Sequence, residues 1–371
     1  MKTSDFDYDL PESAIAQEAL EPRDSARLLL HRVESDTTEH CHVRDLPAIL
    51  RAGDLLVVND TRVRPSRLFG TRASGGRVEL LLLGPVPQGT SESRAGGVWR
   101  AFVKPAKRIK AGETIELEGG ALRARAIERR LDGEGEAGAE WTFELTDVRH
   151  PGRDIEDALE ESGRMPLPPY IRRERDDDPR SESDRERYQT VFAARSGAIA
   201  APTAGLHFTR GLLDALGRSG IEVASVTLHV GVGTFQPMQV DELAHHVMHS
   251  EEYALPAATV EAIARTRARG GRVVAVGTTS ARVLESCADE TGRLTPGSGE
   301  TRLFITPGRK FRAIDALLTN FHLPKSTLLV LVSALAGRER TLRLYREALA
   351  HGYRFYSYGD AMLILADHAS S

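Results

Sequence analysis

The sequence predicts an α/β domain that carries an inserted all-β barrel domain. Between Arg67 and Leu145 the chain holds short strand-like runs separated by turns rich in Gly, Pro and Asp, a spacing typical of a small barrel or sandwich. In the second half, apolar strand-like runs alternate with helical patterns, which favours a largely parallel sheet covered by helices. We therefore expect residues 1–58 and 155–371 to form a discontinuous α/β domain, and residues 59–154 to form the barrel.

The predicted strands are short apolar runs, several of them alternating with polar residues as half-buried strands do. In the barrel they are Arg67–Arg72, Arg77–Leu83, Val98–Val103, Thr114–Leu117, Leu122–Ile127 and Trp141–Leu145. In the α/β domain they are Asp54–Val58, Ile221–Val230, Arg272–Val276 and Ala316–Thr319. Helices are expected to begin beside residues that commonly cap or open them, namely Thr209, Pro256, Ser280 and Ser326.

Composition excludes several classes of protein. A chain of 371 residues, 41% hydrophobic and 27% charged, is typical of a globular protein with more than one domain. The longest apolar run, Leu328–Leu335, is far shorter than the roughly 20 residues of a membrane span. Asp5 and Asp7 interrupt any signal-peptide pattern, and Cys41 and Cys287 form no CxxC pair. We expect a cytoplasmic protein with no membrane contact.

The charge balance argues against a generally basic nucleic-acid binder. Lys and Arg number 49 against 53 Asp and Glu, a net charge of −4. Any contact with phosphates would therefore have to come from a local basic patch. The 43 Arg against 6 Lys would suit phosphate recognition, but a GC-rich coding bias gives the same ratio.

Four segments place glycine, hydroxyl, histidine or aromatic residues beside strand ends. The first two, Gly197–Thr209 and Leu228–Pro237, each pair a histidine with an aromatic ring and a hydroxyl. The other two, Gly277–Arg282 and Leu318–Thr327, follow apolar strands and open helices, whose first N–H groups attract anions. Together they indicate a site for an enclosed polar and aromatic ligand. The alternatives are glycine-rich turns beside core histidines and ordinary helix capping.

These four segments resemble the S-adenosylmethionine:tRNA ribosyltransferase-isomerases of queuosine biosynthesis. The resemblance extends over nearly the whole chain and rests on further segments in a fixed order: Phe6–Pro11, Pro22–Leu28, Val57–Val63, Arg164–Ile171, Tyr188–Ala193 and Tyr353–Met362. The family is known for an α/β domain that carries an all-β barrel, which agrees with the prediction from strand spacing.

The resemblance implies a specific reaction on tRNA. The ribosyl part of S-adenosylmethionine is transferred to 7-aminomethyl-7-deazaguanine at the wobble position and rearranged, giving epoxyqueuosine-tRNA with release of adenine and methionine. S-adenosylmethionine is then a co-substrate and no cofactor or metal is expected. The implied partner is the anticodon region of tRNA, with the base splayed from its loop. We expect no obligate protein partner and a monomer.

The chemistry of this reaction assigns candidate residues. A base and an acid are needed, and histidine serves as either near neutral pH; the catalytic candidates are His207, His229, His322 and Asp360. Thr278, Thr279, Ser280 and Arg282 are expected to hold the amino-acid end. The other substrate-binding candidates, among which the aromatic rings would face the sulfonium, are Thr203, Phe208, Gly231, Gly233, Thr234, Phe235, Asn320, Ser326 and Thr327.

Candidates for the basic patch that contacts tRNA lie in three places. They are Arg62 and Arg64 at the domain junction, Lys104, Lys107, Arg108 and Lys110 in the β block, and Arg172 and Arg173 in a run of mixed charge.

Other motifs give only weak support for a metal site or a dinucleotide-binding site. His245 and His249 are four residues apart and would share one helical face, but no third metal ligand is evident. Gly231 and Gly233 lack the third glycine and acidic residue of a Rossmann fingerprint. Two other functions stay open: a tRNA-binding protein without chemistry, and methyl transfer, which would yield S-adenosylhomocysteine instead of adenine and methionine.

Overall fold

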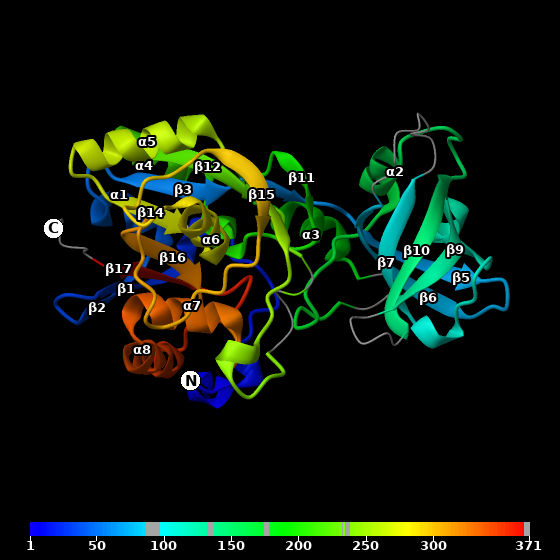
Figure 1. Ribbon diagram of the computed structural model, residues 1–371, viewed down its shortest axis with the longest axis horizontal. Coiled ribbons are helices and arrows are strands. Elements are labelled where there is room, and N and C mark those ends of the chain that lie inside the picture. Colours follow the sequence, from blue (N-terminus) through cyan, green and yellow to red (C-terminus); the bar gives the residue numbers. More distant parts are fainter. Residues whose placement is uncertain (87–96, 132–136, 174–177, 232, 234–237, 367–371) are drawn as a thin grey trace. The chain divides into compact units, whose positions relative to one another are not determined.

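The chain is divided between two structural units (Figure 1). Unit 1 comprises Met1–Arg62, Pro168–Arg172 and Arg187–Ser371, and unit 2 comprises Val63–Leu167 and Arg173–Glu186. The structure is a computed structural model that describes residues 1–86, 97–131, 137–173, 178–231, 233 and 238–366. Unit 1 contains a large sheet with helices and unit 2 a closed barrel, so the predicted fold class is confirmed.

Unit 2 is built around six antiparallel strands that close in the order β10-β7-β6-β5-β8-β9. They are β5 (Arg67–Arg72), β6 (Arg77–Pro85), β7 (Val98–Lys104), β8 (Thr114–Leu117), β9 (Leu122–Leu131) and β10 (Ala137–Asp147). In β6 every second side chain, Val78, Leu80 and Leu82, is buried in the barrel core, as the period of a strand requires. Helix α2 (Ile155–Ser162) packs Ile155 and Leu159 against the same core.

Unit 1 is organised by a nine-stranded sheet in the order β15-β13-β12-β3-β14-β16-β17-β1-β2. The strands are β1 (Arg27–Arg32), β2 (Thr37–His42), β3 (Leu55–Asn59), β12 (Glu222–Leu228), β13 (Glu251–Leu255), β14 (Val273–Val276), β15 (Gly297–Thr301), β16 (Ala316–Asn320) and β17 (Ala361–Leu365). Strands β12, β3, β14 and β16 are parallel, but β17 runs antiparallel to β16. The sheet is thus mixed, where the sequence predicts a largely parallel one.

Helices cover both faces of this sheet because its strands bury alternate side chains in two separate clusters. One cluster takes in apolar residues of α5 (Ala257–Ala268), α6 (Thr278–Cys287), α7 (Thr327–Ala336) and α8 (Arg338–Ala350). The other takes in residues of α1 (Leu46–Ile49) and α4 (Arg210–Arg218). A two-stranded sheet pairs β4 (Thr61–Val63) with β11 (Arg195–Ala198). None of the helices described is long and apolar enough to cross a membrane.

An ion pair fixes the edge of the sheet where the parallel strands begin. The carboxylate of Asp54, just before β3, accepts a hydrogen bond of 2.6 Å from Arg272 Nη2, just before β14, and both side chains are buried. The carboxyl ends of β3, β12, β14 and β16 therefore meet at the opposite edge.

Candidate active site

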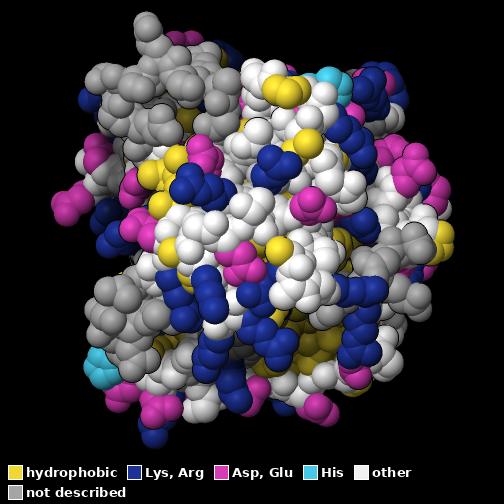
Figure 2. Space-filling view, turned by 90° about the vertical axis from the view of Figure 1, so that its right-hand side faces the viewer, with side chains coloured by type: hydrophobic (Ala, Val, Ile, Leu, Met, Phe, Trp, Pro, Cys, Tyr) yellow, Lys and Arg dark blue, Asp and Glu magenta, His cyan; other side chains and the backbone are white. Residues whose placement is uncertain are grey.

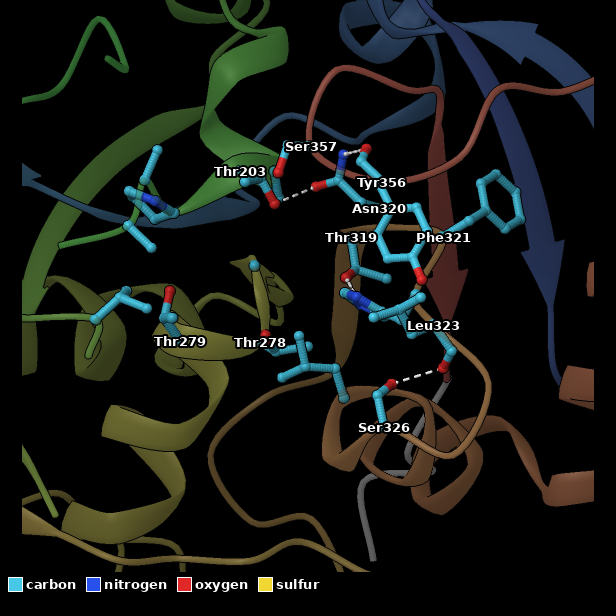
Figure 3. A pocket seen from close by; sticks show the side chains of 18 of the residues that line it. Thr203, Thr278, Thr279, Thr319, Asn320, Phe321, Leu323, Ser326, Tyr356 and Ser357 are labelled. Atoms are coloured by element: carbon cyan, nitrogen blue, oxygen red, sulfur yellow. Dashed lines mark hydrogen bonds between the residues drawn. The ribbon is translucent and has the colours of Figure 1, made fainter. Parts of the chain in front are cut away.

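A cavity of about 60 Å³ lies at the carboxyl ends of β14 and β16 (Figure 3). Its wall is formed by residues 200–204, by Gly277–Thr279 after β14, by Thr319–Leu323 at the end of β16, and by Tyr356 and Ser357 before β17. Ligands collect at this edge of open α/β sheets because strand ends and helix starts converge there. Of the substrate-binding candidates, Thr203, Thr278, Thr279, Asn320 and Ser326 line the cavity.

The amino end of helix α6 opens into the cavity. Gly277 precedes the helix with φ +90°, a conformation that other residues rarely adopt. No side chain caps this helix, and the hydroxyl of Thr279 has no hydrogen-bond partner among the described residues. The prediction that Ser280 caps the helix is wrong, because the helix begins two residues earlier and the Ser280 hydroxyl donates back to Val276 O (2.8 Å).

Asn320 ties three parts of the wall together (Figure 3). Its side-chain oxygen accepts a hydrogen bond from the Thr203 hydroxyl (2.9 Å), and its amide donates to the carbonyl of Tyr356 (3.0 Å). Since the Asn320 side chain is buried, these two bonds hold the loops of the wall together.

His322 is a buried histidine in the cavity wall. Its Nε2 lies 2.7 Å from the Thr319 hydroxyl, and its backbone N–H donates to the hydroxyl of Tyr345 (3.0 Å). Burial lowers the pKa of His322 to about 3, because the charged imidazolium would lose its hydration. The ring is therefore neutral at pH 7. It can accept a proton, but it cannot donate one as an imidazolium would.

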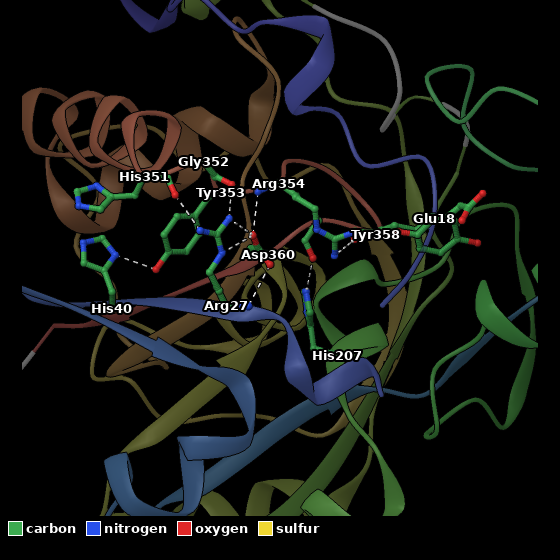
Figure 4. A network of polar contacts seen from close by, with 11 residues as sticks. Glu18, Arg27, His40, His207, His351, Gly352, Tyr353, Arg354, Tyr358 and Asp360 are labelled. Carbon is green, nitrogen blue, oxygen red and sulfur yellow. Dashed lines mark hydrogen bonds and ion pairs between the residues drawn. The ribbon is translucent and has the colours of Figure 1, made fainter. Parts of the chain in front are cut away.

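His207 and Asp360 lie in a neighbouring network and do not line the cavity (Figure 4). The two ring nitrogens of His207 contact the carbonyls of Ala204 (3.1 Å) and Gly359 (3.0 Å). The Asp360 carboxylate accepts hydrogen bonds from the backbone N–H groups of Arg27 (3.0 Å) and Arg354 (2.8 Å), and from the Arg27 guanidinium (3.1 Å). Both side chains thus fix the chain beside the cavity.

His229 follows β12 and also lies outside the cavity lining. Its Nδ1 is 2.8 Å from the Thr61 hydroxyl, and its ring occupies the space that a side chain on Gly197 would need, since a Cβ there would come within 2.7 Å. Gly231 donates its N–H to Glu251 (3.3 Å), and a Cβ on Gly233 would collide with the ring of His249.

The other substrate-binding candidates that the structure describes do not line the cavity either. Phe208 is fully buried in the core, its ring 5.3 Å from that of Phe192. Arg282 is buried in an ion pair with Glu251. Thr327 is the first residue of α7, which Ser326 caps. Thr234 and Phe235 lie outside the described residues.

The predicted helical pairing of His245 with His249 is wrong. The described 3₁₀ helix ends at His245, and the chain continues from His246 in an extended conformation. Within the described residues, no group of three or more His, Cys, Asp or Glu side chains is arranged to hold a metal ion.

The candidates for tRNA contact differ in exposure. Lys104, Lys107, Arg108 and Lys110 are exposed in unit 2, around a short 3₁₀ helix. Arg64 is buried and bonds both carboxylate oxygens of Glu156, and Arg173 pairs with Asp184. Arg62 and Arg172 are exposed, and Arg172 pairs with Glu12. Figure 2 shows one face on which Lys and Arg side chains gather in the lower half.

The buried histidines make stability depend on pH. Burial lowers the pKa of both His207 and His322, so below pH 6.5 the unfolded chain takes up protons that the folded protein does not. We expect the free energy of unfolding to fall steadily as pH is lowered from about 6.5 towards 3. Urea unfolding at several pH values measures this, and His207→Gln should flatten the dependence. The exposed His245→Gln is the control, and equal slopes in both variants would contradict the expectation.

The comparisons with known proteins decide the family. The profile of the family described as queuosine biosynthesis protein matches residues 3–364. The chain belongs to this family. It is 54% identical to an S-adenosylmethionine:tRNA ribosyltransferase-isomerase of Gloeobacter violaceus, over 98% of this chain and 96% of that protein. The protein of the same name in Pelobacter propionicus is 50% identical, over 98% of this chain and 100% of its own.

A solved structure extends the likeness to three dimensions. The crystal structure of an S-adenosylmethionine tRNA ribosyltransferase from Thermotoga maritima is 34% identical, with a TM-score of 0.53, over 98% of this chain and 100% of that one. The resemblance inferred from the sequence is thus confirmed, and the barrel and the mixed sheet are the architecture of a queuosine biosynthesis protein.

Four lining residues with hydroxyl groups were missed as candidates from the sequence of this queuosine biosynthesis protein, namely Tyr170, Thr319, Tyr356 and Ser357. Tyr356 and Ser357 lie within Tyr353–Met362, a segment that already carried the family resemblance, which was the available signal. Thr319 ends the predicted strand Ala316–Thr319 and lies within the segment Leu318–Thr327, but it was not named as a candidate.

Proposed function

We propose that this protein transfers and isomerises the ribosyl part of S-adenosylmethionine onto 7-aminomethyl-7-deazaguanine at the tRNA wobble position. The products are epoxyqueuosine-tRNA, adenine and methionine. The observation that carries the proposal is the cavity, which is lined both by an uncapped helix end and by a neutral buried histidine. Family membership supplies the reaction class.

The helix end suits the amino-acid part of the co-substrate. The first N–H groups of α6 have no partners within the helix, and together with the Thr278 and Thr279 hydroxyls they would hold the carboxylate. The positive end of the helix dipole adds roughly 0.3–2 kcal/mol for an anion. No metal is needed for this binding.

His322 is the residue in the cavity best suited to remove the acidic C–H beside the sulfonium. Its contact with Thr319 fixes the ring. Burial lowers its pKa, so the ring is unprotonated at neutral pH, but it is then a weaker base than a histidine whose pKa lies near the operating pH. Departure of adenine would require a separate proton donor.

One experiment tests the function against its alternatives. Protein treated with a chelator is incubated with S-adenosylmethionine and tRNA that carries the aminomethyl base, and the small products are separated. Release of both adenine and methionine is expected. S-adenosylhomocysteine would indicate methyl transfer, and tRNA binding without product would indicate a binding protein. Activity restored only by zinc would contradict a metal-free mechanism.

We also propose that the enzyme acts in the cytoplasm, where its substrate tRNA is found, and that it acts as a monomer. Sedimentation equilibrium at micromolar concentration should give one 40.6 kDa species; a dimer would contradict this.

The exposed cations of unit 2 are expected to contact tRNA phosphates. Lys107→Gln should weaken tRNA binding and reduce the slope of log K against log salt by about 1. Filter binding from 50 to 300 mM salt measures the slope. Lys310→Gln, an exposed lysine of unit 1, is the control. Unchanged slopes for variants at Lys104, Lys107, Arg108 and Lys110 would place the patch elsewhere.

A further inference from the structure

One hydroxyl in the cavity wall has no partner in the protein. Tyr356 is only 6% exposed, and its Oη forms no hydrogen bond within the described part of the chain. A buried hydroxyl without a partner is destabilising. A group that is buried at such a cost in the wall of a candidate active site points to a partner outside the protein.

The Tyr356 ring is held firmly in this position. It stacks on Tyr170, with ring centres 4.4 Å apart and an angle of 27° between the planes. Tyr170 is in turn bonded to the Ser357 hydroxyl (2.7 Å), and the Tyr356 carbonyl accepts the amide of Asn320 (3.0 Å). Neighbours on two sides thus fix the direction in which the phenol points.

The backbone at Tyr356 is strained. Its φ is +71°, a left-handed conformation that bulky residues rarely adopt. Such strain persists only where the surrounding structure enforces it, and it is frequent at ligand sites. The strained backbone and the unpartnered hydroxyl are independent observations on one residue.

The surroundings select an uncharged partner. Burial keeps the Tyr356 phenol protonated, because it raises the pKa far above the ordinary value, and the nearby His322 is neutral. Figure 3 shows Tyr356 on the side of the cavity formed by Asn320 and Thr319, across from Thr279. A co-substrate whose carboxylate lies at the amino end of α6 would bring its uncharged nucleoside part towards Tyr356.

We propose that Tyr356 is a substrate-contacting residue whose phenol donates a hydrogen bond to the nucleoside part of S-adenosylmethionine. The acceptor is an uncharged atom, either a ribose oxygen or a ring nitrogen of adenine. This inference rests on the proposed function and adds to it a residue that selects the co-substrate by its nucleoside.

Tyr356→Phe tests the proposal because it removes only the hydroxyl. Its free energy of unfolding should equal or exceed that of the wild type, since no protein bond is lost. Its kcat/KM for S-adenosylmethionine should fall about 10- to 100-fold, because the substrate acceptor loses its donor. A merely structural role predicts the reverse, with lower stability and normal kinetics. Tyr253→Phe, the same change on β13 outside the cavity, should keep wild-type kinetics.

Binding of analogues identifies the acceptor and separates the two proposals. Dissociation constants are measured by calorimetry for S-adenosylmethionine and its 2′-deoxy, 3′-deoxy, 3-deaza and 7-deaza analogues. The analogue that lacks the acceptor should bind the wild type more weakly than S-adenosylmethionine does. Tyr356→Phe should bind this analogue and S-adenosylmethionine equally well, because the hydrogen bond is already absent. Two results would contradict the Tyr356 contact but leave the proposed function standing. One is that the losses of affinity are additive for every analogue, and the other is that wild type and Tyr356→Phe bind S-adenosylmethionine equally well. Failure of the wild type to bind S-adenosylmethionine would overturn the proposed function, and the contact with it.

Discussion

Replacing His322 with alanine should give a protein that folds and binds tRNA normally but loses about 10²–10⁴-fold in turnover. The reason is its position: among the three candidate histidines, His322 alone lines the cavity. Since burial holds its pKa at about 3, the loss should be nearly constant from pH 5 to 8. Release of adenine and methionine under saturating substrates measures the effect.

Two further variants separate a catalytic from a structural role of His322. His207→Gln changes a buried histidine outside the cavity and should retain most turnover. Thr319→Val removes the hydroxyl that orients the His322 ring and should cause an intermediate loss. Near-normal turnover of His322→Ala would make this residue structural, and the base would then have to be sought at His207 or His229.

Replacing Asp360 with asparagine should lower the free energy of unfolding by about 2–4 kcal/mol. Breaking a fully buried ion pair costs roughly 3–5 kcal/mol, and the Arg27 side chain is 34% exposed, which reduces the loss. The carboxylate also receives the backbone N–H groups of Arg27 and Arg354, so the loop before β17 should loosen. Because that loop carries Tyr356, turnover of the folded variant should fall as well. Urea unfolding and product release measure the two effects.

Asp54→Asn is the matched control for Asp360→Asn. It weakens a buried pair with Arg272 at the edge of the sheet away from the cavity, so it should lower stability without lowering turnover of the folded protein. If both variants keep the same turnover at a temperature where both are folded, Asp360 acts on stability alone.

The elements that could be predicted from the sequence are those whose pattern is local. The apolar and polar alternation of β6 and the apolar run of β14 identify both strands directly. Strand β2 was missed because Thr37–His42 is polar. It is the last strand of the sheet, so one of its sides pairs with no other strand. Strand β17 was not predicted, and its antiparallel direction could not be, because strand direction depends on how the chain returns to the sheet.

The position of the cavity was predictable from the sequence, but the contacts around it were not. The loops after β14 and β16 were expected to meet, and the cavity lies where they do. Arg282 was expected in the site because it follows the loop in sequence, but the helix turns its side chain towards Glu251. The importance of Tyr356 depends on a distant loop folding back onto Asn320, which no local pattern reveals.

The position of β3 in the sheet has a consequence for synthesis on the ribosome. Strand β3 pairs with β12 and β14, both of which are made after the entire barrel, whose strands all lie between residues 67 and 147. At about 5–20 residues per second, β3 waits roughly 10–40 s for its second neighbour. The barrel can close during that time, while the apolar run Leu55–Val58 has no strand beside it. The nascent chain therefore presents this segment to chaperones, or to other nascent chains, until the second half of the protein has emerged.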